Sequence, residues 1–385
     1  MLFKGTYKFL VAHKALSMHK SCMGAENPGG AYLQQFRALM REMGLSWPEP
    51  SPSNATALGV LLALSYKWQV HLWFDISVLP QPVFGKWRLA FKPAPALPIL
   101  LNQFDSVNDS TSYTAYWMGY YGDLCGNTTT SMNPHTRHDI IKDTRAMEGN
   151  VLIGLSQLIF TPRNLPAVFR LENIGDHSHN IPTATWIKVL QENIQLDPRL
   201  GASDDVSLRN EDLLKTVGEF FGQYPEPRLL RQFAWTFLQM YAPIAEPGML
   251  LRHFGAKYKV TTYRSLFCCF HVEDTHKVLV LSIDLFSRME ENGQDAIRTG
   301  FQRLVSAAVK NVENTMWLYD RSKRFVGDKI ASVQMRARPE KLEKHELEEI
   351  YKDYPSTEGS FGEHWMQARR IIRTAHEKVR HINDS

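Results

Sequence analysis

One string in this sequence has residue types at a spacing that suits a catalytic zinc ion, His345-Glu346-Leu347-Glu348-Glu349. In a His-Glu-x-x-His helix the two histidines lie four residues apart on one face and bind zinc, while the Glu activates the bound water. Here Glu349 stands in place of the second His, and Lys341, Lys344 and Lys352 add positive charge to the same segment. Mixed charge of this kind is typical of a solvent-exposed helix. The sequence therefore favours an exposed helix over a metal site.

Three other groups of His and acidic residues are conceivable metal ligands. They are His135 and His138 beside Asp139, His177 and His179 after Asp176, and His271 and His276 with Glu273 and Asp274. Each pair needs a third ligand that the local sequence does not supply, so exposed loops and helix surfaces are the simpler interpretation. No G-x-S-x-G elbow, phosphate-binding loop or dinucleotide fingerprint occurs. Most of the tryptophans fall on apolar faces, which predicts core packing for Trp47, Trp68, Trp186, Trp235 and Trp317.

The four cysteines are too few for a disulfide-dense scaffold, and none has the C-x-x-C spacing of a zinc or redox pair. Cys268 and Cys269 are neighbours, and adjacent residues on a trans backbone rarely reach disulfide geometry. In an oxidising compartment one of them would have to bond elsewhere. Cys22 and Cys125 are the other two.

Signals for location are weak in this sequence. Asn54, Asn108 and Asn127 begin N-glycosylation sequons in polar surroundings, which favours a secreted context only slightly. The N-terminus has no apolar run long enough for a signal peptide. The best apolar stretch, Val151 to Phe160, is half of the roughly 20 residues that a membrane span needs.

Composition excludes several classes of protein. The chain has 385 residues, 44% of them apolar, so it has enough for a large core and is not a disordered or low-complexity chain. Its 44 Lys and Arg against 40 Asp and Glu give a net charge of +4, interspersed along the sequence. A nucleic-acid surface would need basic residues gathered on one face, so we expect no nucleic-acid partner.

Hydrophobic periodicity predicts a mainly α fold with a small β-hairpin near residues 70–92. Apolar residues alternate from Val70 to Val78 and again from Trp87 to Phe91, which is the pattern of two strands. We expect the Pro-rich stretch from Lys92 to Pro98 to be an extended connector. Helical spacing predicts helices in the segments 15–23, 33–43, 57–64, 113–121, 151–159, 183–194, 211–221, 228–240, 296–312 and 321–337. We expect Phe325, Val326, Ile330 and Val333 to be buried in the last of these. We expect the charged tail 341–385 to form solvated helices outside the core.

The order of several short motifs resembles the N-terminal region of the neprilysin and endothelin-converting-enzyme family of zinc metallopeptidases, especially its divergent arthropod members. The resemblance covers residues 15 to 340. It rests on Ser21-Cys22-Met23, Gly44-Leu45-Ser46-Trp47-Pro48, Tyr66-Lys67-Trp68-Gln69-Val70, Ile76-Ser77-Val78, Pro95-Ala96-Leu97-Pro98, Trp186, Arg264 with Cys268 or Cys269, and the helix bearing Trp317, Ser322, Val326 and Lys329.

The resemblance implies a division of the chain and one covalent link. Residues 1–340 correspond to the family's helical lobe with its β-hairpin, and 341–385 to a charged helical tail leading towards a catalytic lobe. In the family this helical lobe caps the catalytic lobe and limits access to small peptides. The equivalent family cysteines are bridged, so the resemblance implies a disulfide between Cys22 and either Cys268 or Cys269, with Cys125 as the odd thiol.

The zinc helix of the family and its later Glu ligand would follow residue 385, and a membrane anchor or signal peptide would precede residue 1. The resemblance thus implies no catalytic residue and no metal ligand in this chain, and zinc only in the complete enzymes. It also implies an extracellular or membrane-associated location. We therefore expect this chain to be the N-terminal region of a neprilysin-like zinc metalloendopeptidase and to be inactive alone. The alternatives are a secreted non-catalytic pseudopeptidase that binds peptides or proteins, and an unrelated intracellular helical scaffold.

Overall fold

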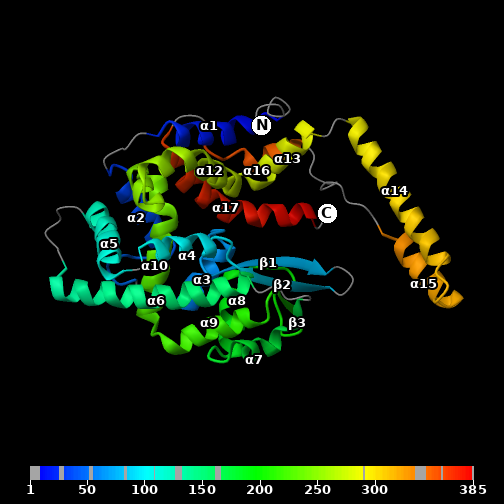
Figure 1. Ribbon diagram of the computed structural model, residues 1–385, viewed down its shortest axis with the longest axis horizontal. Helices are drawn as coiled ribbons and strands as arrows, with labels where there is room; N and C mark the ends of the chain where they lie inside the picture. Colours follow the sequence, from blue (N-terminus) through cyan, green and yellow to red (C-terminus); the bar gives the residue numbers. More distant parts are fainter. Residues whose placement is uncertain are drawn as a thin grey trace. The chain divides into compact units, whose positions relative to one another are not determined.

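The computed structural model describes residues 9–25, 30–51, 55–81, 85–107, 109–125, 132–160, 166–288, 291–333, 344–356 and 359–383. The chain divides into two compact units, whose helices and strands are labelled in Figure 1. The smaller unit combines Met1–His19 with Phe270–Glu358, and the larger combines Lys20–Cys269 with Gly359–Ser385. The predicted boundary at residue 340 falls in 334–343, outside the described residues, and stays a prediction.

The larger unit is mainly helical, which confirms the predicted fold class. Helix α1 (Ala12–Met23) enters it and α12 (Lys257–Thr275) leaves it. Its other helices are α2 (Leu33–Glu42), α3 (Ala57–Tyr66), α4 (Leu97–Ser106), α5 (Ser110–Cys125), α6 (Pro134–Phe160), α7 (Ile174–Ser178), α8 (Thr183–Asn193), α9 (Asp212–Gln223), α10 (Glu226–Ala245), α11 (Leu250–Phe254) and α17 (Phe361–Asn383), with 3₁₀ turns η3 (Leu171–Asn173) and η4 (Pro247–Met249).

The predicted hairpin is present and is part of a four-stranded sheet. Its strands are β1 (Phe74–Gln81), β2 (Lys86–Pro93), β3 (Ala167–Arg170) and β4 (Asp205–Leu208), in the order β1-β2-β4-β3. The first two are antiparallel, with Ile76 opposite Phe91, as the alternation predicts. Beside them β4 runs parallel to β2 and antiparallel to β3. The expected connector is also shorter than predicted, because β2 continues to Pro93 and α4 begins at Leu97 with Pro98 in its first turn, where a proline is tolerated.

The core of the larger unit lies around α10. Every side chain from Gln232 to Glu246 is buried, so this helix is surrounded by protein. It contacts α2, α3, α6 and α17. The rings of Trp47 and Trp235 stack with centroids 5.5 Å apart, and Trp47 also packs on Trp117 at 4.8 Å. The predicted burial of Trp47, Trp68, Trp186 and Trp235 is thus confirmed.

The expectation of a solvated tail is wrong for α17. Phe361, Trp365 and Ala368 form a buried stripe on this helix, and fully buried Arg369 lies beside it. The Arg369 guanidinium donates to the backbone carbonyl oxygens of Gln69 at 3.0 Å and Trp68 at 3.4 Å. An amphipathic helix is placed by its apolar stripe, whatever the charge on its other faces. Helix α17 is therefore part of the core of the larger unit.

The smaller unit holds most of α1, the end of α12, and α13 (Lys277–Arg288), α14 (Glu291–Glu313), α15 (Asp320–Ala331) and α16 (Lys344–Tyr351). Helices α14 and α15 form a pair (Figure 1). The sequence predicts burial for three side chains that this pair exposes. Phe325 is 64% exposed, Val333 54% and Trp317 81%. A two-helix pair has room between its helices for only one face of each, which leaves the remaining apolar residues in solvent.

Candidate functional site

The structure does not assemble a metal site at His345. This residue lies exposed on α16, and Glu349 accepts a hydrogen bond from the Lys352 ammonium. Among the described residues, no three His, Cys, Asp or Glu side chains come close enough together to hold a metal ion. The described residues therefore provide no ligand set for the zinc ion that the family resemblance implies for complete enzymes.

The other predicted ligand pairs are either exposed or packed against aromatic rings. His135 and His138 lie exposed on the first turns of α6. His177 stacks on Phe169, with ring centroids 3.7 Å apart, next to the loop that holds His179. His271 and His276 are buried in the smaller unit, where His276 stacks on Tyr351 at 5.7 Å. The sequon asparagines Asn54, Asn108 and Asn127 lie outside the described residues.

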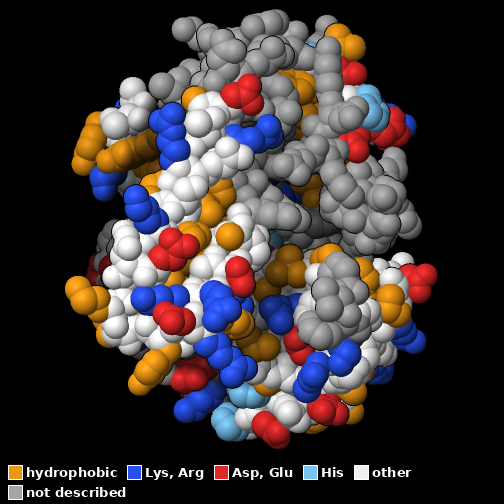
Figure 2. Space-filling model, turned by 90° about the vertical axis from the view of Figure 1, so that its right-hand side faces the viewer, with side chains coloured by type: hydrophobic (Ala, Val, Ile, Leu, Met, Phe, Trp, Pro, Cys, Tyr) orange, Lys and Arg blue, Asp and Glu red, His pale blue; other side chains and the backbone are white. Residues whose placement is uncertain are grey.

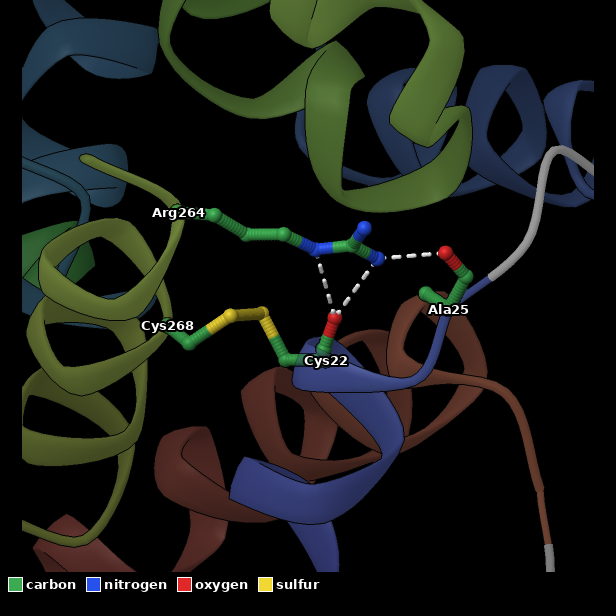
Figure 3. The surroundings of a disulfide bond; sticks show 4 residues. All are labelled: Cys22, Ala25, Arg264 and Cys268. Carbon is green, nitrogen blue, oxygen red and sulfur yellow. Dashed lines mark hydrogen bonds between the residues drawn. A yellow bond between two sulfur atoms is a disulfide. The ribbon is translucent and has the colours of Figure 1, made fainter. Parts of the chain in front are cut away.

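A disulfide joins α1 to α12 (Figure 3). The structure links Cys22 to Cys268, with Cα atoms 5.7 Å apart, whereas Cys269 and Cys125 are half-buried thiols. Arg264, one turn before Cys268, points its guanidinium at the end of α1. It donates to the carbonyl oxygen of Cys22 from Nη2 at 3.0 Å and Nε at 3.3 Å, and also to that of Ala25. A cation at the carboxyl end of a helix is favourable, so Arg264 caps α1 where the disulfide holds it.

A buried acid in the larger unit was not foreseen from the sequence. Glu148 of α6 is fully buried, and its carboxylate accepts hydrogen bonds from three side chains on two helices. Tyr113 of α5 and Trp235 of α10 donate to Oε2, the latter at 2.8 Å, and the Gln239 amide donates to Oε1 at 2.6 Å. Gln239 in turn accepts from the Tyr116 hydroxyl at 3.2 Å. We call these five residues the Glu148 network.

Burial governs the titration of this network. Desolvation raises the pKa of Glu148, although the hydrogen bonds from Tyr113, Gln239 and Trp235 act in the opposite direction. The pKa of Tyr113 is raised well above its ordinary value by burial and by the neighbouring carboxylate. The five residues of the network lie on α5, α6 and α10, and none of them lines a cavity described below. Its geometry suits a structural role in the core, since the carboxylate is buried and accepts hydrogen bonds from three side chains.

Among the described residues of the larger unit, two of the open cavities are candidate sites by their size. One, of about 660 Å³, follows α6 and α9 and is lined by polar residues including Asn150, Asp212 and Glu219. The other, of about 530 Å³, lies between the end of α1, the residues after α10 and the start of α17, next to Ser21, Pro247 and Phe361. The described residues that line these two cavities include neither His nor Cys, so neither lining offers a Ser–His or Cys–His constellation.

Surface charge is interspersed on the face drawn in Figure 2. Lys and Arg side chains alternate there with Asp and Glu, and single hydrophobic side chains lie between them. Among the described residues, no helix combines the length and the apolar character that crossing a bilayer requires.

The fold resembles that of a bacterial zinc peptidase. In the open-state cryo-EM structure of the zinc metalloprotease Zmp1 from Mycobacterium tuberculosis, the similarity has a TM-score of 0.56 at 11% identity and covers 98% of this chain. In the crystal structure of Zmp1 with an inhibitor, it has a TM-score of 0.52 at 12% identity and covers 96%. In each case the chain spans 59% of the Zmp1 chain. No protein-family model and no curated protein sequence matches.

This likeness shows a shared fold. The bacterial source of both structures leaves the predicted affinity to arthropod members as a prediction.

Proposed function

We propose that this chain is the N-terminal, helical region of a neprilysin-like zinc metallopeptidase that cleaves peptides. The observation that carries the proposal is the fold shared with a zinc metalloprotease over nearly the whole of this chain and 59% of that protein. The Cys22–Cys268 disulfide lies at the pair of positions that the family resemblance implies, which adds support.

Catalysis in this proposal belongs to residues outside these 385. A metallopeptidase needs a bound zinc ion to lower the pKa of water and a carboxylate to take its proton. The sequence has no His-Glu-x-x-His motif, and the described residues offer no metal cluster. The region described here would shape access to the active site and contribute no catalytic group.

Exposed apolar residues between α14 and α15 support the proposal that this chain is one region of a larger peptidase. Met316 is 99% exposed, Trp317 81% and Tyr319 85%, all in the turn that joins the two helices. Soluble chains seldom leave three large apolar side chains exposed side by side unless another surface covers them. We propose that the remainder of the peptidase covers this turn. The disulfide supports an extracellular location, because disulfides persist in oxidising compartments.

Sequencing the transcript beyond the codon for Ser385 tests the proposal. We expect the frame to continue into a His-Glu-x-x-His helix. The extended protein should then bind one zinc ion and cleave a fluorogenic peptide, with activity lost on chelation. A stop codon directly after Ser385 would instead favour the non-catalytic pseudopeptidase that binds peptides or proteins.

Metal analysis of the 385-residue chain gives a second test. Mass spectrometry should find well under one equivalent of zinc after gel filtration. Stoichiometric zinc that is lost on His345→Ala would contradict the proposal, whereas His138→Ala serves as the matched control on an exposed histidine.

A further inference from the structure

We propose that a small cavity at the carboxyl end of α10 binds a primary ammonium group. The cavity has a volume of about 270 Å³ and is lined by residues that include Glu246, Asp123 and Arg252. Glu246 directly follows the last residue of α10 and is only 5% exposed. Its Oε2 atom accepts a hydrogen bond from the backbone N–H of Gly30 at 2.6 Å.

Among the described residues, the other carboxylate oxygen of Glu246 has no hydrogen-bond partner. Its Oε1 atom is buried, and no described residue donates a hydrogen bond to it. A buried carboxylate oxygen without a donor is strongly unfavourable, because the water that would solvate it in the unfolded chain is lost. Because Oε1 has almost no contact with solvent, the Glu246 side chain must turn this oxygen toward the cavity before a ligand can donate to it, and the hydrogen bond so formed would remove that penalty.

Charge around the cavity favours a cation. The carboxyl end of α10 carries negative partial charge, to which the Glu246 carboxylate adds. Arg252 also lines the cavity, but it donates from both Nε, at 3.0 Å, and Nη2, at 2.7 Å, to Oδ2 of Asp123. Arg252 is held there against α5, since a Cβ atom placed on Gly119 would lie 2.0 Å from its Nη1. The positive charge of Arg252 is therefore paired with Asp123, and it does not balance the negative charge of the Glu246 carboxylate.

The donor pattern selects an ammonium over other cations. A guanidinium binds a carboxylate best through both oxygens, and Oε2 of Glu246 already accepts from Gly30. Calcium takes six to eight oxygen ligands, usually including several carboxylates, and the acidic residues of this lining are Glu246 and Asp123, of which Asp123 already binds Arg252. An ammonium has three N–H donors on one small head, which suits a single buried oxygen and its neighbours. The volume lies below the roughly 300–1,000 Å³ of drug-sized pockets, so the ligand is a small amine or the end of a longer chain.

The inference is independent of the peptidase proposal, because it rests on Glu246, Asp123 and Arg252 alone. Its test uses the full chain and glycinamide, which carries a primary ammonium and no carboxylate. Binding is measured by a saturation-transfer NMR titration at pH 6.5, below the α-ammonium pKa of about 7.7–8.0. N-acetylglycinamide, which has no ammonium, is the matched ligand. Nα-acetyl-lysine amide separates a side-chain ammonium from an α-ammonium.

We expect glycinamide or Nα-acetyl-lysine amide to bind saturably and N-acetylglycinamide not to bind. Glu246→Gln should weaken the binding by roughly tenfold or more, because the charge-assisted hydrogen bond is lost. Glu192→Gln, an exposed position on α8, should leave it unchanged. Equal binding of the acetylated ligand, no effect of Glu246→Gln, or displacement by CaCl₂ at concentrations below that of the amine would each overturn the proposal. If Glu246→Gln fails to fold, the comparison of ligands on the wild-type protein still decides.

Discussion

Removing the carboxylate of Glu148 should destabilise the larger unit severely. In Glu148→Ala the donors of Tyr113, Trp235 and Gln239 lose their acceptor inside the core. Each buried donor left unsatisfied costs about 1–3 kcal/mol, and the truncated side chain leaves a cavity that adds to the loss. Because the losses at the three donors and at the cavity overlap, we expect a decrease of about 3–6 kcal/mol in the free energy of unfolding. That is a large part of the roughly 5–15 kcal/mol that stabilises a typical domain.

Glu148→Gln should be much milder, because the amide keeps the shape and one acceptor oxygen. That oxygen can accept from both Tyr113 and Trp235, as Oε2 of Glu148 does. The new NH₂ group faces the amide nitrogen of Gln239, so Gln239 must turn over to offer its oxygen. Turning over gives up the hydrogen bond from the Tyr116 hydroxyl. We expect a decrease of about 1–2 kcal/mol, the cost of one disturbed hydrogen bond.

The pH dependence of that difference has a definite sign. Burial raises the pKa of Glu148 in the folded chain, so the folded chain binds the proton more tightly than the unfolded chain. The resulting stabilisation is complete below the ordinary Glu pKa of about 4.3 and is lost as the pH rises through the raised pKa. Glutamine does not titrate. The penalty of Glu148→Gln relative to wild type should therefore be largest in acid and shrink as the pH rises.

Urea unfolding followed by circular dichroism at several pH values between 4 and 8 measures both effects. Glu219→Gln, exposed on α9, is the matched control and should change the free energy of unfolding by less than about 0.5 kcal/mol. An Ala penalty below about 1 kcal/mol would refute the role of the Glu148 network. A Gln penalty that grows with pH would refute the direction of the pKa shift.

Three further predictions concern the disulfide, the buried arginine and the exposed helix pair. Cys22→Ser with Cys268→Ser removes a link across 246 positions, worth about 5 kcal/mol in the loop-entropy model, so the urea midpoint should fall; non-reducing peptide mapping that found the link at the neighbouring thiol would contradict the assignment. Arg369→Met removes the buried donor to the backbone carbonyls of Trp68 and Gln69 and should cost about 1–3 kcal/mol, against less than about 1 kcal/mol for exposed Arg370→Met; equal losses would show that burial is not the cause. Trp317→Ser should leave the melting temperature unchanged but reduce the binding of an apolar fluorescent dye, and a clear fall in that temperature would mean that the ring is packed.

Periodicity predicted the long elements well, because each offers several repeats of its pattern. Helix α2 begins at the predicted Leu33 and ends one residue before the predicted limit, and Gly44 follows with a positive φ of 80°. Strands β3 and β4 were missed because four residues hold too little alternation to recognise. Their pairing brings Phe169 opposite Val206, a contact between distant segments that a local pattern cannot encode. The prediction for the tail was wrong because it rested on the charge of the segment and left out the apolar stripe that begins at Phe361.

The buried acid on α6 left a trace in the sequence that can be recognised in retrospect. Glu148 lies seven residues after Ile141 and four before Leu152, on the same helix face, so a lone carboxylate interrupts an apolar stripe. Such a residue is buried with partners or it is not tolerated. Its partners are not predictable in this way, because Trp235 and Gln239 come from a helix nearly a hundred residues later. Glu246 left no comparable trace, since an acid after a helix end is unremarkable until its burial is known.

Apolar core positions and buried polar groups carry different information about a protein. A core tolerates extensive apolar substitution when volume and pattern are kept, so two chains with 11% identity can have one fold. The likeness to a zinc metalloprotease therefore reflects apolar positions and says nothing about polar groups such as Glu148 and Glu246. Those groups are costly to bury and must each be justified by partners or by a ligand. Because both lie against α10, one in its middle and one at its end, substitutions there distinguish what holds this fold together from what the chain binds.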